Sequence, residues 1–372
     1  MGRKRGKNNN RKNDYDSNFV LNNEKFELFY RIQDFLNQTD ADSYEFFIDT
    51  LRKPLPSCFR IRNGLSFAEL LSKQVMSYSD EKIESLNGTI QTLDVTKLDW
   101  CPNAFKLGLD RRFLRKGKNE RGKEFHEWLM IHTESGNITR QEAVSMVPPL
   151  AMNVESHHKC LDMCASPGSK TNQILEIIDQ SLKDSVEKQG IVVANDKDTE
   201  RAYMLVHQCR RSISPLLLVT THAGQDFPSL NAVPGVKREN RQPIFDRVLC
   251  DVPCSGDGTL RKNPLAWKNW RCHNGLALHP LQLQISNRGI QLTKNGGLMT
   301  FSTCSMSPYE DECVVAELLR THREEIELID AREFVPNFKC RSGLNSWVVL
   351  DDHYMKPINI KDGTCPILSD EM

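Results

Sequence analysis

The sequence predicts an α/β fold in which a doubly wound, Rossmann-like parallel sheet follows a mainly helical N-terminal region. From residue 158 onward, short and continuously apolar runs alternate with longer segments of helical periodicity. Apolar runs without alternation are typical of strands that helices cover on both faces. Polar loops rich in cysteine follow several of these runs. Ligands of such sheets bind at the carboxyl ends of the strands, so these loops are the candidate site.

Composition and charge restrict the class of protein. The chain has 372 residues, enough for about two or three domains. No run approaches the about 18 apolar residues of a membrane span. The amino terminus also lacks the apolar core of a signal peptide. We therefore expect neither a membrane protein nor a secreted one.

The first residues form a basic arm. Residues 1–16 carry six Lys or Arg and two Asp, and the rest of the chain carries 43 basic and 47 acidic side chains. Such a polar segment buries too little apolar surface to fold alone. We expect residues 1–17 to be a disordered arm that tethers nucleic acid or directs the protein to the nucleus, including the nucleolus. The alternative is a solvated tail without a role.

The twelve cysteines are dispersed along the chain, and no CxxC pair occurs. Without a secretory signal we expect them to be reduced thiols. Cys160 with Cys164 and Cys250 with Cys254 form two CxxxC pairs, but no histidine cluster completes a zinc site at the usual spacing. We therefore expect no metal site.

In the N-terminal region, apolar residues at helical spacing predict helices over 26–36 and 43–55, and a third that begins within 67–71. The run 110–123 carries seven Lys or Arg and is expected to be an exposed helix face and loop. Thr139 and Glu142 form a capping box, which predicts a helix from about residue 140 to Val147 that stops at Pro148 and Pro149. We place the boundary between an N-terminal RNA-binding region (18–135) and a catalytic domain (136–350) just before this helix, with a tail over 351–372.

The catalytic domain is expected to alternate strands and helices, joined by right-handed crossovers. The expected strands are 158–163, 190–195, 215–221, 245–251 and 296–303, and the expected helices are 169–182, 199–211, 276–294 and 309–322.

The first loop of the sheet, within 162–171, predicts a nucleoside site. A glycine at the turn lets the backbone approach a ligand closely, and the following helix start favours a negative group. A dinucleotide site requires GxGxxG, but only Gly168 is present; a P-loop requires adjacent Gly and Lys, but Ser169 separates Gly168 from Lys170. A ligand such as S-adenosylmethionine remains, beside the alternative of an ordinary turn.

The second loop ends a strand with Asp196, and a carboxylate there can accept both ribose hydroxyls. Asp198 is the alternative for this role, and a strand-end Asp can also simply cap the following helix.

Two cysteines follow the ends of two further strands. Cys254 lies in the loop that begins at Asp251, and Cys304 lies just past the last strand. A thiolate that adds to carbon 6 of a pyrimidine makes carbon 5 nucleophilic, a carboxyl group near ring nitrogen 3 stabilises the adduct, and a second thiol assists release. Asp251 suits the carboxyl role. Cys250 and Cys313 are expected to face the core instead.

The motifs LDMCASPGSKT, VANDKD, FDRVLCDVPCSGDGTLRKNP and FSTCSMSPYEDECVVAELL resemble those of the NOL1/NOP2/Sun family of RNA 5-methylcytosine methyltransferases. TESGNITRQEAVSMVPPL and LRKNPLAWKNW resemble the tRNA-methylating Nsun2/Trm4 branch. The resemblance covers roughly residues 45–350. It implies a class I methyltransferase fold, S-adenosylmethionine as methyl donor, and tRNA, together with other RNAs, as the partner.

The resemblance also implies roles for individual residues. Cys304, within Thr303-Cys304-Ser305, matches the nucleophile, and Cys254 matches the cysteine needed for product release. The reversed assignment of the two thiols is chemically reasonable too. Asp251 and Lys170 match the family's acid and lysine, and Asp196 matches the ribose acid. The cofactor loop matches Cys164, Ala165, Ser166, Pro167, Gly168, Ser169 and Lys170, with Asp251 beside it.

The sequence departs from the family in two places. An Asp is usual near the adenine, but the matching residue is Ala223, so either Asp226 or Gln225 is expected to substitute for it, or the binding of adenine is expected to be weaker. The chain also ends soon after the catalytic domain, where members of this branch continue into a region that helps hold RNA, so a short member is expected. A catalytically weak RNA-binding or assembly protein is therefore the alternative function.

Four basic residues lie among two tryptophans in this part of the chain: Arg261, Lys262, Lys268 and Arg271 beside Trp267 and Trp270. The basic residues are expected to bind phosphate. The tryptophans are expected either to stack a splayed base or to belong to the core.

Overall fold

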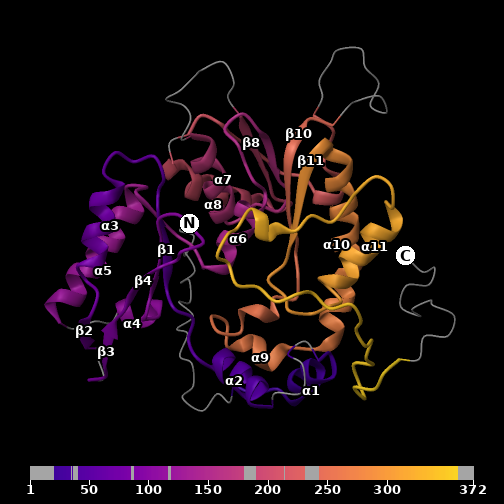
Figure 1. Cartoon of the computed structure of the whole chain (residues 1–372), viewed down its shortest axis with the longest axis horizontal. Helices are drawn as coiled ribbons and strands as arrows, with labels where there is room; N and C mark the ends of the chain where they lie inside the picture. Colours follow the sequence, from indigo (N-terminus) through magenta and orange to yellow (C-terminus); the bar gives the residue numbers. More distant parts are fainter. Residues whose placement is uncertain are drawn as a thin grey trace, which may run out of the picture.

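The computed structural model describes residues 21–34, 36, 41–84, 88–115, 119–179, 190–212, 214–230 and 243–358. The predicted arm over 1–17 and the tail beyond residue 358 lie outside the described residues. Figure 1 shows the parallel sheet near the centre of the molecule, between the N-terminal region on one side and the helices α10 and α11 on the other.

The central sheet has five described strands in the order β11-β10-β7-β8-β9, and every neighbouring pair is parallel. The strands are β7 (Lys159–Asp162), β8 (Ile191–Asn195), β9 (Leu217–Thr220), β10 (Phe245–Asp251) and β11 (Thr293–Ser302). The predicted parallel sheet is therefore confirmed. The last strand begins three residues earlier than its sequence suggested.

Helices cover both faces of this sheet. They are α6 (Val147–Ala151), α7 (Ser169–Asp179), α8 (Thr199–Cys209), α10 (Cys272–Leu292) and α11 (Glu312–Thr321), whereas the short helix α9 (Leu265–Asn269) lies away from the sheet (Figure 1). Helices α6, α7 and α8 pack on one face, and α10, with α11 against it, packs on the other. Successive side chains of β10 point to opposite faces of the sheet. Leu249 packs with Ile174 of α7 on one face, whereas Val248 and Cys250 pack with Ile285 of α10 on the other.

The strand order of the sheet reverses between β7 and β10. After β7 it adds β8 and β9 on one side, and then returns to place β10 and β11 on the other. Loops that leave neighbouring strands in opposite directions open a crevice, and this is the usual ligand position in open α/β sheets. The loops after Asp162 and Asp251 flank this point.

The N-terminal region is rich in helices, as expected, but it is organised around a sheet that the sequence did not reveal. Its helices are α1 (Glu24–Ile32), α2 (Ala41–Arg52), α3 (Ala68–Met76), α4 (Arg111–Arg115) and α5 (Glu120–Glu134). The sheet has the order β4-β5-β1-β6, with β2 and β3 paired separately. These strands are β1 (Cys58–Ile61), β2 (Glu81–Glu84), β3 (Ile90–Leu93), β4 (Val95–Lys97), β5 (Ala104–Leu107) and β6 (Ile138–Arg140). They have three or four residues each, too few for a clear periodicity.

The capping box does not start a helix. Thr139 lies in β6, which pairs antiparallel with β1, and its hydroxyl donates to Glu176 Oε1 at 3.2 Å. The prediction of a helix that ends at Pro148 and Pro149 is wrong, because the prolines occupy the first turn of α6. Proline suits that position, since a first-turn N–H has no partner within the helix. β6 begins at Ile138, beyond the boundary placed near residue 136.

A buried ion pair joins the two sheets. Arg60 of β1 donates from Nη1 to Glu176 Oε2 of α7 at 2.5 Å and from Nη2 to Oε1 at 3.2 Å. Both side chains are no more than 2% exposed. Gln141 accepts from Arg60 Nε at 2.9 Å, so the guanidinium is held on its remaining side as well. The pair fixes the N-terminal sheet against the helix that carries Lys170.

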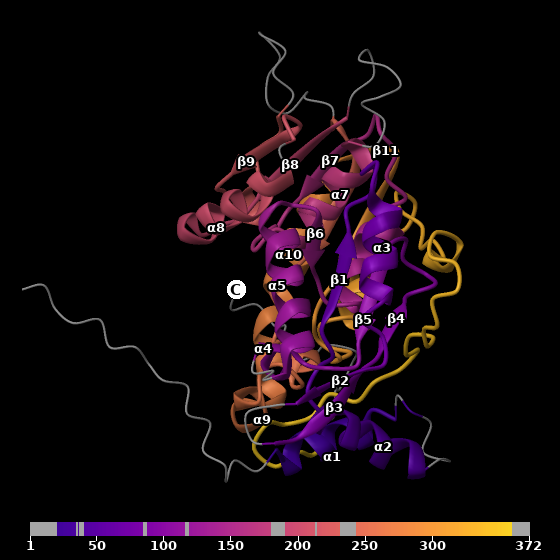
Figure 2. The same ribbon diagram turned by 90° about the vertical axis from the view of Figure 1, so that its left-hand side faces the viewer.

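Helices α1 and α2 lie apart from that sheet, at the far end of the molecule next to α9 in both views (Figures 1 and 2). Asn23 Nδ2, at the start of α1, donates to the Trp267 carbonyl of α9 at 2.8 Å. Among the described residues, no helix combines the length and the apolar character that a membrane crossing requires.

Arg60→Leu should lower the free energy of unfolding by about 3–5 kcal/mol, because it leaves the Glu176 carboxylate buried without its cation. Urea unfolding followed by circular dichroism measures this. The double variant Arg60→Leu/Glu176→Leu should recover most of the loss. Lys73→Leu breaks the exposed pair with Glu69 and should change stability little. A loss in Arg60→Leu no larger than that of Lys73→Leu would contradict the importance of the buried pair.

Candidate active site

The two cysteines predicted at the sheet edge are in contact. Cys254 follows β10, Cys304 follows β11, and their sulfur atoms lie 3.2 Å apart. The backbone N–H of Cys304 also donates to Cys254 Sγ at 3.3 Å. Cys304 is exposed and Cys254 is half-buried. Because the two sulfur atoms are in contact and Cys304 is exposed, both thiols can approach the same group of a ligand.

Glycines allow the two cysteine loops to approach this closely. Gly258 N donates to the Cys304 carbonyl at 3.0 Å, and a Cβ on Gly258 would lie only 2.7 Å from that oxygen. Gly256 has a φ of +72°, in the left-handed region that favours glycine. The two glycines of the Ser-Gly-Asp-Gly sequence are therefore required for the packing of the two loops. They also leave the site open.

The contact decides which sulfur carries the charge. Hydrogen bonding from Cys254 lowers the pKa of Cys304, and the charges of Lys262 and Lys170 lower it further, against burial and the charge of Asp251. Sharing the proton with Cys304 and burial raise the pKa of Cys254. Hydrogen bonding to a charged form favours that form. The thiolate form is therefore favoured at Cys304, which makes Cys304 the stronger candidate nucleophile of the pair.

Lys170 and Asp251 form an ion pair beside the thiols. Lys170, in the first turn of α7, donates from Nζ to Asp251 Oδ2 at 2.7 Å, and both side chains are partly buried. Ser302 Oγ of the neighbouring strand donates to Asp251 Oδ1 at 2.8 Å. The sequence predicted both residues for the site, and the structure brings them together. The pair presents a cation and a carboxylate at the same strand end.

Asp162 was not assigned a role by the sequence reasoning, although it ends β7 at the sheet edge. It is 1% exposed, and Thr171 Oγ1 donates to its Oδ2 at 2.7 Å. Its Oδ1 is a buried oxygen without a hydrogen-bond partner among the described residues. Burial raises the pKa of Asp162 to about 7, and the charge of Asp251 adds to the rise. An unsatisfied buried acceptor at this point suits a ligand with a donor group.

The first loop is pressed against α8. Gly168 has a φ of +107°, and a Cβ on it would lie 2.8 Å from Leu205 Cδ1 of α8. Both the backbone conformation and the packing against α8 therefore require a glycine at position 168. Of the other residues predicted for this loop, Ala165 and Ser166 are buried, Cys164 and Ser169 are half-buried, and Pro167 is exposed.

Asp196 is buried, with 4% of its surface exposed, rather than open on the rim. Its Oδ2 accepts the backbone N–H of Ser166 at 3.2 Å, and its Oδ1 accepts that of Asp198 at 3.0 Å. It thereby links the first two loops. Arg201 Nη2 also lies 3.4 Å from Oδ2, so Oδ1 is the oxygen whose second lone pair can accept a ribose hydroxyl. Asp198 is the N-cap of α8, because its side chain accepts from Arg201 N at 2.9 Å.

The third loop is held by Asn195, a fully buried residue that the sequence reasoning missed. Asn195 Nδ2 donates to the His222 carbonyl at 2.8 Å, and Asn195 Oδ1 accepts from His222 N at 2.9 Å. Ala223 and Gln225 follow half-buried, and Asp226 is exposed at the end of this turn. The position of Gln225 or Asp226 as a substitute for Ala223 stays a prediction.

The two tryptophans belong to the core. Trp267 is 1% and Trp270 is 7% exposed, and both pack with residues of α1 and with Tyr309. They therefore offer no face for stacking a base. Lys262 Nζ lies 2.6 Å from Glu142 and close enough to Cys304 to affect its charge.

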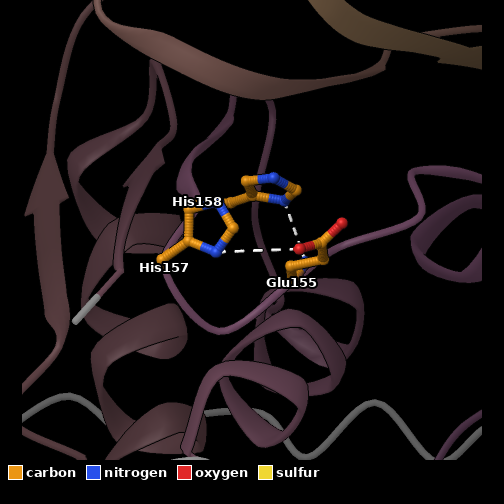
Figure 3. Close-up of side chains that lie close together, drawn as sticks. All are labelled: Glu155, His157 and His158. Atoms are coloured by element: carbon orange, nitrogen blue, oxygen red, sulfur yellow. Dashed lines mark hydrogen bonds and ion pairs between the residues drawn. The ribbon is translucent and has the colours of Figure 1, made fainter. Parts of the chain in front are cut away.

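Three potential metal ligands lie within 4.8 Å of one another in the part of the chain that the structure describes: Glu155, His157 and His158 (Figure 3). His158 Nδ1 accepts the backbone N–H of Glu155 at 2.8 Å, so that lone pair is already in use. The three residues precede β7 and therefore lie at the opposite end of the parallel sheet from the thiols. They take no part in the candidate active site. The eleven described cysteines are free thiols.

Residues 149–344 match the family model for 16S rRNA methyltransferase RsmB/F. The chain is 39% identical over 360 residues to the multisite-specific tRNA:(cytosine-C(5))-methyltransferase of Saccharomyces cerevisiae, over 94% of this chain and 50% of that protein. It is 40% identical over 353 residues to the enzyme of that description named trm4b of Schizosaccharomyces pombe, over 90% of this chain and 52% of that protein. The chain thus spans about half the length of these relatives.

Among solved structures, NSun6 from Pyrococcus horikoshii with SFG is similar, with a TM-score of 0.58 and 16% identity over 80% of this chain and 87% of that one. A likeness at this identity concerns the fold, which is that of a class I methyltransferase.

Cys254→Ala should move the alkylation of Cys304 by iodoacetamide to higher pH, because Cys304 loses the donor that stabilises its thiolate. Mass spectrometry of the peptide that contains Cys304, over a series of pH values, measures this. Cys58→Ala removes a half-buried thiol from β1 and should leave the profile unchanged. If Cys254→Ala leaves the pH profile of alkylation unchanged, or moves it to lower pH, the hydrogen bond from Cys254 does not stabilise the Cys304 thiolate.

Proposed function

Because the chain belongs to the 16S rRNA methyltransferase RsmB/F family, we propose that it transfers a methyl group from S-adenosylmethionine to carbon 5 of cytosine in RNA. The observation that carries the proposal is the 3.2 Å contact between Cys254 and Cys304 beside the Lys170–Asp251 pair. Methyl transfer to a nucleophilic nitrogen needs no thiol, whereas carbon 5 of a pyrimidine must first be activated by a nucleophile at carbon 6.

The RNA that we propose as substrate is tRNA. The two relatives that are about 40% identical to this chain are named as tRNA cytosine methyltransferases. The chain spans about half of each, so tRNA and other RNAs as partners are part of the proposal. The basic run 110–123 and the region over 18–135 are proposed to contact phosphates, which supply affinity without sequence preference. A cytosine within a duplex or stack must leave it to reach the thiols.

Cys304 is proposed to start the reaction. Its thiolate adds to carbon 6, and the electron pair of the 5,6 double bond moves toward carbon 5 and the ring. The exposure of Cys304 gives the base access, and its lowered pKa favours the charged sulfur. S-adenosylmethionine, when bound, supplies the electrophilic methyl group that carbon 5 then accepts.

Lys170 and Asp251 are proposed to face ring nitrogen 3. Negative charge develops there as Cys304 adds, and a proton held between the ammonium and the carboxylate stabilises it by hydrogen bonding. Ser302 fixes the orientation of Asp251, and the first turn of α7 fixes Lys170. The pair is preorganised for this role because its members come from neighbouring elements of the sheet edge.

Cys254 is proposed to assist release. After methyl transfer, the proton on carbon 5 must leave, its electron pair restores the 5,6 double bond, and the bond from carbon 6 to the Cys304 sulfur breaks. Cys254 gives its proton to solvent and, as a thiolate, accepts the carbon 5 proton, and Cys304 then leaves carbon 6 as a thiolate. The contact distance between the sulfur atoms places both within reach of one base.

The residues of the first two loops fit S-adenosylmethionine. The unpartnered Asp162 Oδ1 suits the donor amino group of its methionine part, and Asp196 suits the ribose hydroxyls. Cys164, Ala165, Ser166, Pro167, Gly168 and Ser169 form the loop that would surround it, with Lys170 and Asp251 next to the reacting end. A nuclear location, including the nucleolus, is also proposed, and its support is the basic arm alone.

Bisulfite sequencing of tRNA incubated with the purified protein and S-adenosylmethionine tests the activity directly. New protected cytosines that require both the protein and the donor are the expected result. Binding of tRNA without methylation would instead favour the RNA-binding or assembly protein.

Cys304→Ala should abolish both methylation and any covalent RNA adduct, because no addition to carbon 6 can start. Cys254→Ala should still form the adduct but release it slowly. The Cys254→Ala protein should therefore accumulate as an RNA-linked species that survives denaturing gel electrophoresis and disappears after nuclease treatment. Trapping in Cys304→Ala rather than in Cys254→Ala would reverse the two assignments, and wild-type behaviour of Cys254→Ala would make Cys254 a packing residue.

Asp196→Asn should weaken the binding of S-adenosylmethionine about tenfold or more, because hydrogen bonds to a charged acceptor are stronger than those to a neutral one. Isothermal titration calorimetry measures this. The matched variant Asp198→Asn changes the N-cap of α8 and should retain wild-type affinity. Loss of affinity in Asp198→Asn alone would move the ribose role to Asp198.

A further inference from the structure

A buried carboxylate lies directly behind the nucleophile loop. Asp257, 2% exposed, is the first residue of a short 3-10 turn between β10 and α9. Its Oδ1 accepts the backbone N–H of Met306 at 2.8 Å and the hydroxyl of Ser305 at 3.0 Å. Its Oδ2 accepts Trp270 Nε1 at 3.2 Å and the hydroxyl of Tyr30. One carboxylate thus binds the two residues that follow Cys304 and two aromatic side chains.

Tyr30 reaches this carboxylate from a distant part of the chain. It lies in α1, 227 positions before Asp257, and is 1% exposed. Its ring packs with the rings of Phe26, Phe29 and Trp270. These contacts, with the hydrogen bond from Asn23 to the Trp267 carbonyl, fix α1 against α9. The family model begins at residue 149, so α1 lies outside the part of the chain that it matches.

The Tyr30 hydrogen bond is costly to remove for a physical reason. Burial raises the pKa of Asp257, and the hydrogen bonds from Tyr30, Met306 and Trp270 lower it again. A buried carboxylate that loses one of its donors is less stable in its charged form, and a protonated carboxyl accepts more weakly. The bonds to Ser305 and Met306 therefore depend on the bond from Tyr30.

We propose that Tyr30 is a positioning residue of the active site, which holds Cys304 in contact with Cys254 through Asp257. Gly256 and Gly258, on either side of Asp257, form the surface against which Cys304 lies, so a shift of Asp257 changes the separation of the two thiols. Ser305 Oγ also lies 2.6 Å from Glu310 Oε2, so the two carboxylates share its single proton, and Glu310 Oε1 accepts the backbone N–H of Ser255 at 2.7 Å. This second tether keeps the loop folded when the first is weakened.

The reactivity of Cys304 reports this geometry. The groups that set its charge are Cys254, which donates to it, the cations Lys170 and Lys262, and the opposing anion Asp251. Loosening the loop moves Cys304 away from its donor, and its thiolate then forms only at higher pH. Loss of a hydrogen bond to a charged group corresponds to about a tenfold or greater change in an equilibrium.

Tyr30→Phe retains the ring in its aromatic cluster and removes only the hydroxyl. Alkylation of Cys304 by iodoacetamide, followed by mass spectrometry, should slow about tenfold near neutral pH and shift its profile to higher pH. Tyr44→Phe is the matched control, because Tyr44 belongs to the same cluster but its hydroxyl donates to the Glu27 carbonyl at 2.6 Å. This control should show the wild-type profile.

A wild-type profile in Tyr30→Phe, a shift to lower pH, or an equal shift in Tyr44→Phe would overturn the proposal. If Tyr30→Phe lowers the melting temperature more than Tyr44→Phe does, Asp257→Asn provides the second test. It removes one acceptor oxygen without touching α1, and it should shift the profile in the same direction. A wild-type profile in Asp257→Asn would then overturn the proposal.

With tRNA as substrate, Tyr30→Phe should lower kcat and leave KM unchanged, because the Tyr30 side chain is buried and inaccessible to RNA. This arm rests on the proposed function, whereas the alkylation arm requires neither RNA nor methyl donor. Failure of the wild-type protein to methylate tRNA would therefore overturn the proposed function and leave the alkylation result standing. A raised KM with unchanged kcat would overturn the positioning role.

Discussion

Parallel pairing of β10 with both β7 and β11 places the carboxyl ends of three strands at one edge, and the candidate site depends on this register. Asp251 lies opposite Ser302, and Leu249 lies opposite Asp162. Cys254 and Cys304 each follow their strand end within three residues, so the register brings the two loops together. A slip of one strand by a single residue would turn its side chains to the other face.

The loop that carries Cys304 is held by a series of short polar contacts while its thiol stays exposed. Thr303 Oγ1 donates to Asp311 Oδ1 at 2.6 Å, two buried carboxylates share the hydroxyl proton of Ser305, and Ser307 N donates to Ser305 Oγ at 3.0 Å. Burial raises the pKa of Asp311 to about 8. Buried acids that are satisfied by hydroxyl and backbone donors fix the loop. A reacting group held in this way needs little reorganisation when a ligand arrives.

Residues before 149 complete the structure around this loop. Arg60 holds α7 from the N-terminal sheet, and Tyr30 holds Asp257 from α1. One contact supports the helix that carries Lys170, and the other supports the loop that carries Cys304. The matched methyltransferase domain is thus packed on both sides of its site by segments from the N-terminal region.

Local patterns in the sequence determined the parallel sheet, the loops at its edge and the residue types that they carry. Apolar runs and helical spacing depend on neighbours along the chain, and strand ends follow from them, so Asp251, Cys254 and Cys304 were predicted as site residues, and the family resemblance added Lys170. Local reading failed where pairing across the fold overrode it, because Thr139 caps no helix when β6 pairs with β1. Only the tertiary structure placed the two sulfur atoms in contact across 50 positions and Tyr30 on Asp257 across 227. Such contacts have no periodicity, because the folded chain, and not the sequence separation, sets the distance between their atoms.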